Sequence, residues 1–262
     1  MNLNQAEQET PRAFSGVDRL YGPGAHSALE RAAILVVGIG GVGSWAAEAL
    51  ARNGVGRIAL ADLDHVAESN INRQIQALVP TLGMAKTEAM AQRIAAINPA
   101  CVVTSIEDFV SPDNVAEILR VPYDAVIDCT DQVSAKVAMA LHCLAMRIRL
   151  FMAGAAGGRI DPTRIRCADL GAAHGDALLA RVRQLLRKSG QINLLDKVPF
   201  GIDVVFSSEP MRRPNAQNCN TGSAPQGLSC AGYGSSVCVT GGFGFALAAA
   251  TIEHLLAHRP AA

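Results

Sequence analysis

The sequence predicts an α/β fold built on a doubly wound, mainly parallel sheet, and three observations support this class. Short apolar runs alternate with amphipathic segments, as buried parallel strands alternate with helices. A glycine-rich turn follows the first apolar run, in the segment VVGIGGVGSW at 36–45. Aspartates follow several later runs, and the carboxyl ends of strands are where such folds bind ligands.

The first half of the chain alternates strands and helices in regular order. Strands are expected at five apolar runs, 32–38, 57–61, 101–106, 123–128 and 149–153. Helices are expected over 41–53, where Gly54 ends the helix, over 86–97, where Asn98-Pro99 ends it, and from the fourth strand to about 146. Crossover connections of this kind produce a parallel sheet.

The second half departs from this alternation. It is expected to form a β-hairpin over 157–167 with Asp161-Pro162 in its turn, a basic helix over 176–188, a strand over 203–207 and a mobile loop over about 209–229. The apolar segment 237–257 is expected to be a helix buried against the sheet or a dimer partner. Its minor alternative is contact with a membrane, and stable insertion is not expected.

Composition places the chain in a broad class. It has 262 residues, a formal net charge of zero and 7 cysteines without a CxxC pair. These numbers predict one domain over 1–262, with a nucleotide-binding core at 15–153 and an extension at 154–262. The unpaired cysteines and the polar N-terminal segment predict a reduced, cytoplasmic protein.

The glycine turn predicts a nucleotide site. Gly38, Gly40 and Gly43 have the spacing of a strand-to-helix turn that lets the backbone approach phosphates. Asp62 ends the next predicted strand, where a carboxylate can bind ribose hydroxyls. These residues fit NAD as well as ATP.

The stretch that follows Asp62 favours ATP. Arg73 can stabilise charge that builds on phosphates when one of their bonds breaks, and Asn70 and Gln74 can orient phosphate oxygens or a metal. Lys86 adds a second positive charge, and Asp131 can hold Mg²⁺ with the phosphates. The alternative for the two cations is helix capping or surface ion pairing.

In this order the motifs GIGGVGS, DxD, SNxxRQ, GxxK and DCTD resemble those of the ubiquitin-activating-enzyme-like adenylyltransferases, over about residues 15–153. The resemblance implies that the chain uses ATP and Mg²⁺ to adenylate a carboxylate. It also implies a homodimer in which Arg73 reaches the partner's ATP in trans, assisted by Arg19. The nucleotide-binding residues that it implies are Gly38, Gly40, Gly41, Gly43, Ser44, Asp62, Asp64, Asn70, Arg73, Gln74, Lys86 and Asp131. Of these, Arg73, Lys86 and Asp131 are the candidate catalytic residues, and Asp131 is the candidate metal ligand.

Further motifs resemble a narrower branch of the family, whose members dehydrate N6-threonylcarbamoyladenosine in tRNA. They are RLYGPGA, NINRQIQAL, EDFVSPDN, AGAAGGRIDPTRI and VVFSSE, which extend over nearly the whole chain. The branch implies a tRNA substrate whose carboxylate is activated by ATP. Adenylation gives that carboxylate a good leaving group, and the nearby carbamoyl group can then attack at high effective concentration.

The cysteines separate this chain from the bacterial members that hold a structural zinc in two CxxC pairs. Cys167, Cys219, Cys230 and Cys238 form no such pair, so no zinc is expected. Cys230 is a candidate thiol that could accept an acyl group or sulfur from a cysteine-desulfurase partner, and its alternative is a small buried residue. The sequence leaves a monovalent-cation requirement open.

The sequence is also compatible with three other functions. The first is adenylation of the C-terminal glycine of a sulfur-carrier or ubiquitin-like protein, the second an NAD-dependent oxidoreductase, and the third a non-enzymatic nucleotide-binding module. Contacts with tRNA phosphates are hypothesised for basic residues of the extension, whose alternative is a solvated helix face and a disordered loop. These residues are Arg181, Arg183, Arg187, Lys188, Arg212 and Arg213.

Overall fold

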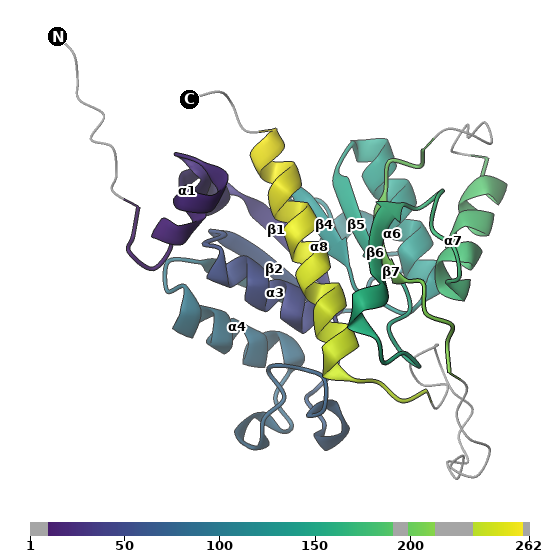
Figure 1. Ribbon diagram of the computed structural model, residues 1–262, viewed down its shortest axis with the longest axis horizontal. Coiled ribbons are helices and arrows are strands. Elements are labelled where there is room, and N and C mark those ends of the chain that lie inside the picture. Colours follow the sequence, from purple (N-terminus) through teal and green to yellow (C-terminus); the bar gives the residue numbers. More distant parts are fainter. Residues whose placement is uncertain (1–9, 191–198, 213–232, 259–262) are drawn as a thin grey trace.

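One sheet of seven strands, in the order β3-β2-β1-β4-β5-β7-β6, forms the centre of the protein in the computed structural model (Figure 1), which describes residues 10–190, 199–212 and 233–258. All neighbouring strands are parallel except β6 and β7. The strands are β1 (Ala33–Val37), β2 (Arg57–Ala61), β3 (Val102–Ile106), β4 (Ala125–Asp128), β5 (Arg149–Ala153), β6 (Ile165–Asp169) and β7 (Asp203–Ser207). The predicted α/β class is confirmed.

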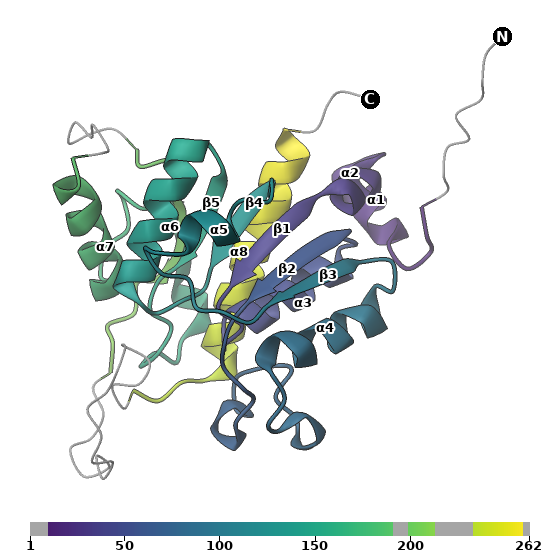
Figure 2. The same cartoon turned by 180° about the vertical axis from the view of Figure 1, so that it is seen from behind.

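Helices cover both faces of the sheet, with one apolar core on each side (Figures 1 and 2). The first face carries α1 (Ser15–Tyr21), α2 (Ala25–Arg31), α3 (Gly43–Arg52), α4 (Lys86–Ile97) and α8 (Val237–Ala257). The second face carries α5 (Val115–Ile118), α6 (Val133–Met146) and α7 (Ala177–Lys188). Three 3₁₀ turns, η1 (Glu68–Asn70), η2 (Val79–Thr81) and η3 (Pro162–Arg164), lie in the connections.

The prediction of a β-hairpin over 157–167 is wrong. Only its second half is a strand, β6, which pairs antiparallel with β7 from Ile165 opposite Ser207 to Asp169 opposite Asp203. A side chain holds the segment before it, because Glu209 Oε2 accepts the backbone N–H groups of Ile160 at 3.0 Å and Asp161 at 2.9 Å. These amides are therefore satisfied without a partner strand. The two-stranded unit exists, but its other strand comes from a later part of the chain.

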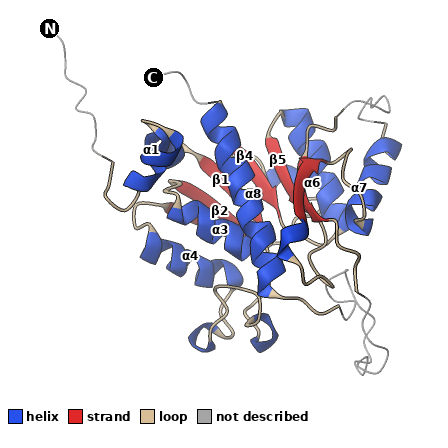
Figure 3. Cartoon of the chain, viewed as in Figure 1, coloured by secondary structure: helices blue, strands red, loops and turns tan. Residues whose placement is uncertain are grey.

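The bounds of the other predicted elements agree with the structure to within a few residues. Figure 3 shows the observed helices in blue and the strands in red. Sequence reasoning did not anticipate α1, α2 or the single turn α5. Most of the loop expected over 209–229 lies outside the described residues. Its first residues, 209–212, are described and form neither helix nor strand.

The long apolar helix α8 lies against the body of the protein. It is long and apolar enough to cross a membrane by length and composition, yet half of its most apolar window is buried inside the protein. Gly244 allows its close approach to α3, since a Cβ there would lie 2.5 Å from the Val42 carbonyl oxygen and 2.7 Å from Trp45 Cβ. Phe243 and Leu247 are fully buried in the same core. The helix therefore packs against the fold, as the sequence predicts.

Candidate functional site

The glycine turn lies where β1 ends, between its neighbours β2 and β4, and its glycines are required by close backbone contacts. Gly38 has φ +85°, and a Cβ on Gly43 would lie 1.9 Å from the Gly38 carbonyl oxygen. A Cβ on Gly38 would lie 3.1 Å from the backbone of Cys129, just beyond β4. Gly40 differs, because no atom lies within 4 Å of the position of its Cβ. The turn is thus packed on the protein side and open at its tip.

Replacing Gly43 with alanine should disrupt this turn. The new methyl group cannot coexist with the Gly38 carbonyl, so the turn must shift, at a cost of about 1–3 kcal/mol in unfolding free energy. Gly40→Ala is the matched control, since the added methyl group enters open space. Urea denaturation of both variants measures the difference. Equal stabilities would contradict the packing described here.

Asp62, which directly follows β2, fixes the backbone of the glycine turn by a hydrogen bond. Its Oδ2 accepts the Ile39 N–H at 2.6 Å, and its Oδ1 accepts the Asp64 N–H at 2.9 Å. Burial raises the pKa of Asp62 above its ordinary 3.8, although the Lys86 ammonium and the two amides act to lower it. Lys86, at the start of α4, donates to Asp64 Oδ2 at 2.6 Å. The structure therefore brings the predicted aspartates and lysine together beside the glycine turn.

The loop of the SNxxRQ motif lies against the other side of the turn. Asn70 is buried and its Oδ1 accepts the Ala67 N–H at 3.1 Å, which shapes the loop. The Arg73 stem contacts the turn, because a Cβ on Gly41 would lie 3.1 Å from Arg73 Cγ. Its guanidinium donates to the Ser69 carbonyl at 2.7 Å. Gln74 is buried and accepts a hydrogen bond from the side chain of Gln76.

Ser44 has an internal role. It is fully buried in the first turn of α3, and its Oγ accepts the Ile75 N–H at 3.4 Å. This contact joins the helix after the glycine turn to the SNxxRQ loop. Among the predicted nucleotide-binding residues, Ser44 therefore supports the arrangement of the others.

The DCTD loop follows β4 at the same edge of the sheet. Asp128 Oδ1 accepts both the N–H and the hydroxyl of Thr130, at 2.9 and 2.7 Å, and so shapes the loop that carries Asp131. Burial, with the nearby Asp128, raises the pKa of the Cys129 thiol, so this thiol is neutral near pH 7. Cys129 packs behind Gly43, since a Cβ on Gly43 would lie 3.2 Å from Cys129 Cβ. Asp131 is partly buried just beyond this thiol.

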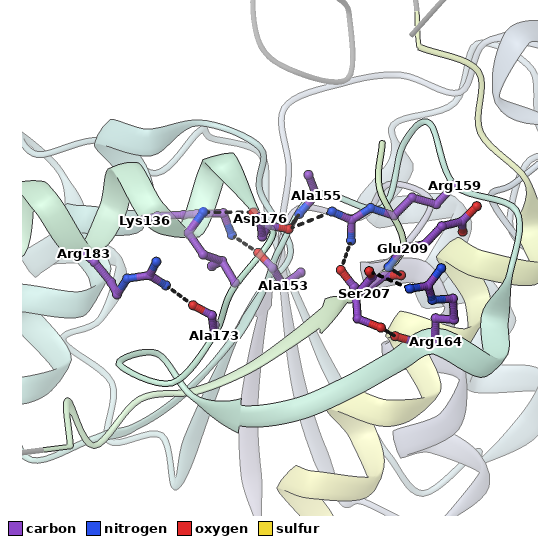
Figure 4. Close-up of polar contacts among 12 residues, drawn as sticks. Lys136, Ala153, Ala155, Arg159, Arg164, Ala173, Asp176, Arg183, Ser207 and Glu209 are labelled. Atoms are coloured by element: carbon purple, nitrogen blue, oxygen red, sulfur yellow. Dashed lines mark hydrogen bonds and ion pairs between the residues drawn. The ribbon is translucent and has the colours of Figure 1, made fainter. Parts of the chain in front are cut away.

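A buried polar network beside the site escaped sequence reasoning (Figure 4). Lys136 and Asp128 form an ion pair at 3.1 Å with both side chains fully buried, and Lys136 also donates to the Ala153 carbonyl at 2.7 Å. Arg159 donates to the Ser207 carbonyl at 2.9 Å and lies 3.5 Å from Asp176, which caps α7. These contacts join the ends of β4, β5 and β7. The sequence signal that could have indicated this network is Lys136, a single lysine among the mostly apolar residues of α6.

The basic residues of α7 are not equivalent. Arg183 points inward and donates to the carbonyl groups of Leu170 and Ala173, at 3.1 and 2.7 Å. Arg187 lies over the Phe200 ring, 5.7 Å from its centroid, and Arg181 and Lys188 are exposed. Arg212 lies 3.6 Å from Glu209. Arg183 is therefore not a candidate for contacts with tRNA phosphates. For the exposed basic residues, such contacts stay a prediction.

The candidate thiol Cys230 lies outside the described residues, and so do Cys219 and Arg213. Within the described ranges, no group of three or more His, Cys, Asp or Glu side chains is arranged to hold a metal ion. Because those two cysteines are not described, the expectation of no zinc stays a prediction.

The chain is similar to known proteins over almost its full length. Residues 16–260 match the model of the ThiF family. The tRNA threonylcarbamoyladenosine dehydratases of Haemophilus influenzae and Escherichia coli are 43% and 44% identical, with 93% of each chain covered. The crystal structure of the E. coli dehydratase TcdA in complex with ATP matches with a TM-score of 0.84 at 43% identity, covering 94% of both chains.

A second group of relatives matches less of the chain. The adenylyltransferase and sulfurtransferase MOCS3 of Drosophila virilis is 35% identical over 48% of this chain and 28% of its own length. The similarity to this group therefore stops at about half of the chain.

Proposed function

Because the chain belongs to the ThiF family and, within it, to the tRNA threonylcarbamoyladenosine dehydratases, we propose that it uses ATP to dehydrate N6-threonylcarbamoyladenosine in tRNA. The observation that carries this proposal is the extent of the match, which includes the extension after residue 153. Relatives of the sulfurtransferase type match only about half of the chain. The TcdA structure with ATP supports ATP as the co-substrate.

The proposed reaction has two steps, adenylation of the substrate carboxylate and ring closure. The substrate carboxylate attacks the α-phosphorus of ATP, which forms an acyl adenylate and releases pyrophosphate. The neighbouring carbamoyl group then attacks the activated carbonyl carbon, and AMP leaves with the carboxylate oxygen. The net change in the nucleoside is the loss of one water. Because both reacting groups belong to one nucleoside, no protein nucleophile is needed.

The site residues fit these steps. Asp62, beside the glycine turn, would bind ribose hydroxyls. Lys86 and Arg73 would stabilise the negative charge that moves to the phosphates during adenylation. Gly40, at the open tip of the turn, would let the backbone approach them.

Asp131 is the proposed ligand of Mg²⁺, and its carboxylate is an oxygen ligand of the kind that this ion prefers. Bound Mg²⁺ would neutralise phosphate charge. Asp128 would support Asp131 by fixing the loop between them through Thr130.

The same proposal includes a cytoplasmic homodimer in which Arg73 acts in trans. A cysteine-desulfurase partner that delivers sulfur to Cys230 is a further hypothesis. A requirement for a monovalent cation is another.

The test is mass analysis of nucleosides from tRNA that carries threonylcarbamoyladenosine, incubated with the protein, ATP and Mg²⁺. The expected result is the loss of one water, dependent on ATP and absent from matched tRNA without the modification. No mass change, together with ATP–pyrophosphate exchange when a carrier protein ending in Gly-Gly is supplied, would assign the chain to carrier activation instead.

Metal removal gives a separate prediction. EDTA should abolish the loss of water, and added Mg²⁺ should restore it, because the phosphates need a counter-ion. A chelator selective for zinc should leave the rate unchanged, since no Cys₄ site is expected. Loss of activity with the zinc chelator, restored by Zn²⁺, would contradict the expectation from the cysteine spacing.

A further inference from the structure

Gln76 is a buried amide behind the glycine turn that sequence reasoning did not select. It is 1% exposed, and its Nε2 donates both to the Ile39 carbonyl at 2.9 Å and to Gln74 Oε1 at 3.1 Å. Its own Oε1 is buried and has no hydrogen-bond partner in the described part of the chain. A buried acceptor without a partner costs free energy, so its presence calls for an explanation.

These two hydrogen bonds determine which end of each side-chain amide, the oxygen or the NH₂, Gln76 and Gln74 present to their partners. A backbone carbonyl can only accept, so the group of Gln76 that faces Ile39 must be its NH₂. The second N–H of that NH₂ meets Gln74, which must therefore present its oxygen to Gln76. As a consequence, the NH₂ of Gln74 points away from Gln76.

The same contacts fix the peptide group between Ile39 and Gly40. Asp62 holds the Ile39 N–H, and Gln76 holds the Ile39 carbonyl. The peptide bonds are trans, so the Gly40 N–H points opposite to that carbonyl and away from Gln76. Among the described residues, no backbone carbonyl accepts this N–H. It belongs to the residue at the open tip of the turn.

We propose that Gln76 is a positioning residue that aims two donors, the Gly40 N–H and the Gln74 amide, at the phosphates of ATP. It acts by pulling the Ile39 carbonyl and the Gln74 oxygen inward. The unpartnered Gln76 oxygen follows from this arrangement, because the NH₂ of the same amide is committed to both acceptors. This inference rests on the proposed function, since it requires a phosphate-bearing ligand at the turn.

The test compares the Kd of ATP and of adenosine for the wild type, Gln76→Met and Gln92→Met. Methionine fills a similar volume without a donor and removes the unpartnered oxygen, so the fold should be retained. Gln76→Met should bind ATP about tenfold more weakly, because donors to charged groups are misaligned. Its Kd for adenosine should stay within about twofold, because Asp62 remains in place. Gln92 is an exposed residue of α4, and Gln92→Met should match the wild type for both ligands.

An unchanged Kd for ATP in Gln76→Met, or equal weakening for ATP and adenosine, would overturn the inference, since a general loosening of the site affects both ligands. If Gln76→Met fails to fold, Gln76→Leu replaces it, because leucine also lacks the donor and adds no charge near the phosphates. The same selective loss for ATP is then expected. A wild-type protein that binds adenosine but not ATP would overturn the proposed function itself.

Discussion

Replacing Arg73 with alanine should lower the rate of ATP-dependent dehydration by about 10³-fold, while ATP still binds. The guanidinium is expected to stabilise charge that develops on the phosphates, which affects the transition state more than the bound ground state. Single-turnover rates and the Kd of ATP measure the two effects separately. Arg120→Ala is the control, because Arg120 pairs with Glu117 on the surface with both side chains 71% exposed.

Mixing two inactive variants tests whether Arg73 acts in trans. Within one chain, its guanidinium donates to the Ser69 carbonyl and to Asn72 Oδ1, both in its own loop. In a mixed dimer of Arg73→Ala with Asp131→Ala, one site would combine the intact Asp131 of one chain with the intact Arg73 of the other. Random mixing should then restore about a quarter of wild-type activity. No recovery in a dimer shown to be mixed would mean that Arg73 serves its own site.

The sequence predicted the strands β1 to β5 because the signals for these strands are local. Each strand from β1 to β5 is a short apolar run, and a glycine or an aspartate marks where most of them end. The error at 157–167 arose because strand pairing is not local. Whether a segment pairs with its neighbour or with a distant strand depends on contacts such as those of Glu209, which lies far along the chain.

The candidate site divides in the same way. Gly43, Asp62 and Lys86 were identifiable because their spacing relative to predicted strands reflects the chemistry of nucleotide binding. Gln76 and Lys136 were not, because their roles depend on which backbone carbonyl each side chain reaches. Such partners are set by the packing of the loop or helix. A sequence pattern can therefore indicate groups that contact a ligand more readily than groups that hold them.

Replacing Lys136 with methionine should cost about 3–5 kcal/mol of unfolding free energy. The substitution leaves the Asp128 carboxylate fully buried without its cation. The net contribution of the intact ion pair to stability is smaller than this cost, because forming the pair already required desolvating both charges. For a chain of this size the melting temperature should fall by about 10 °C. Arg120→Met, which breaks an exposed pair, should change the stability by less than about 1 kcal/mol.

The double variant Lys136→Met with Asp128→Asn identifies the origin of that loss. Asparagine removes the stranded charge and keeps an oxygen that can accept from the N–H and hydroxyl of Thr130. If the uncompensated charge is the cause, the double variant should be more stable than Lys136→Met alone, measured by thermal and urea denaturation. Equal or lower stability would assign the loss to the hydrogen bond from Lys136 to the Ala153 carbonyl instead. The double variant should also lose less activity than the single variant, because it removes the buried charge and keeps the contact to Thr130 that holds the loop carrying Asp131.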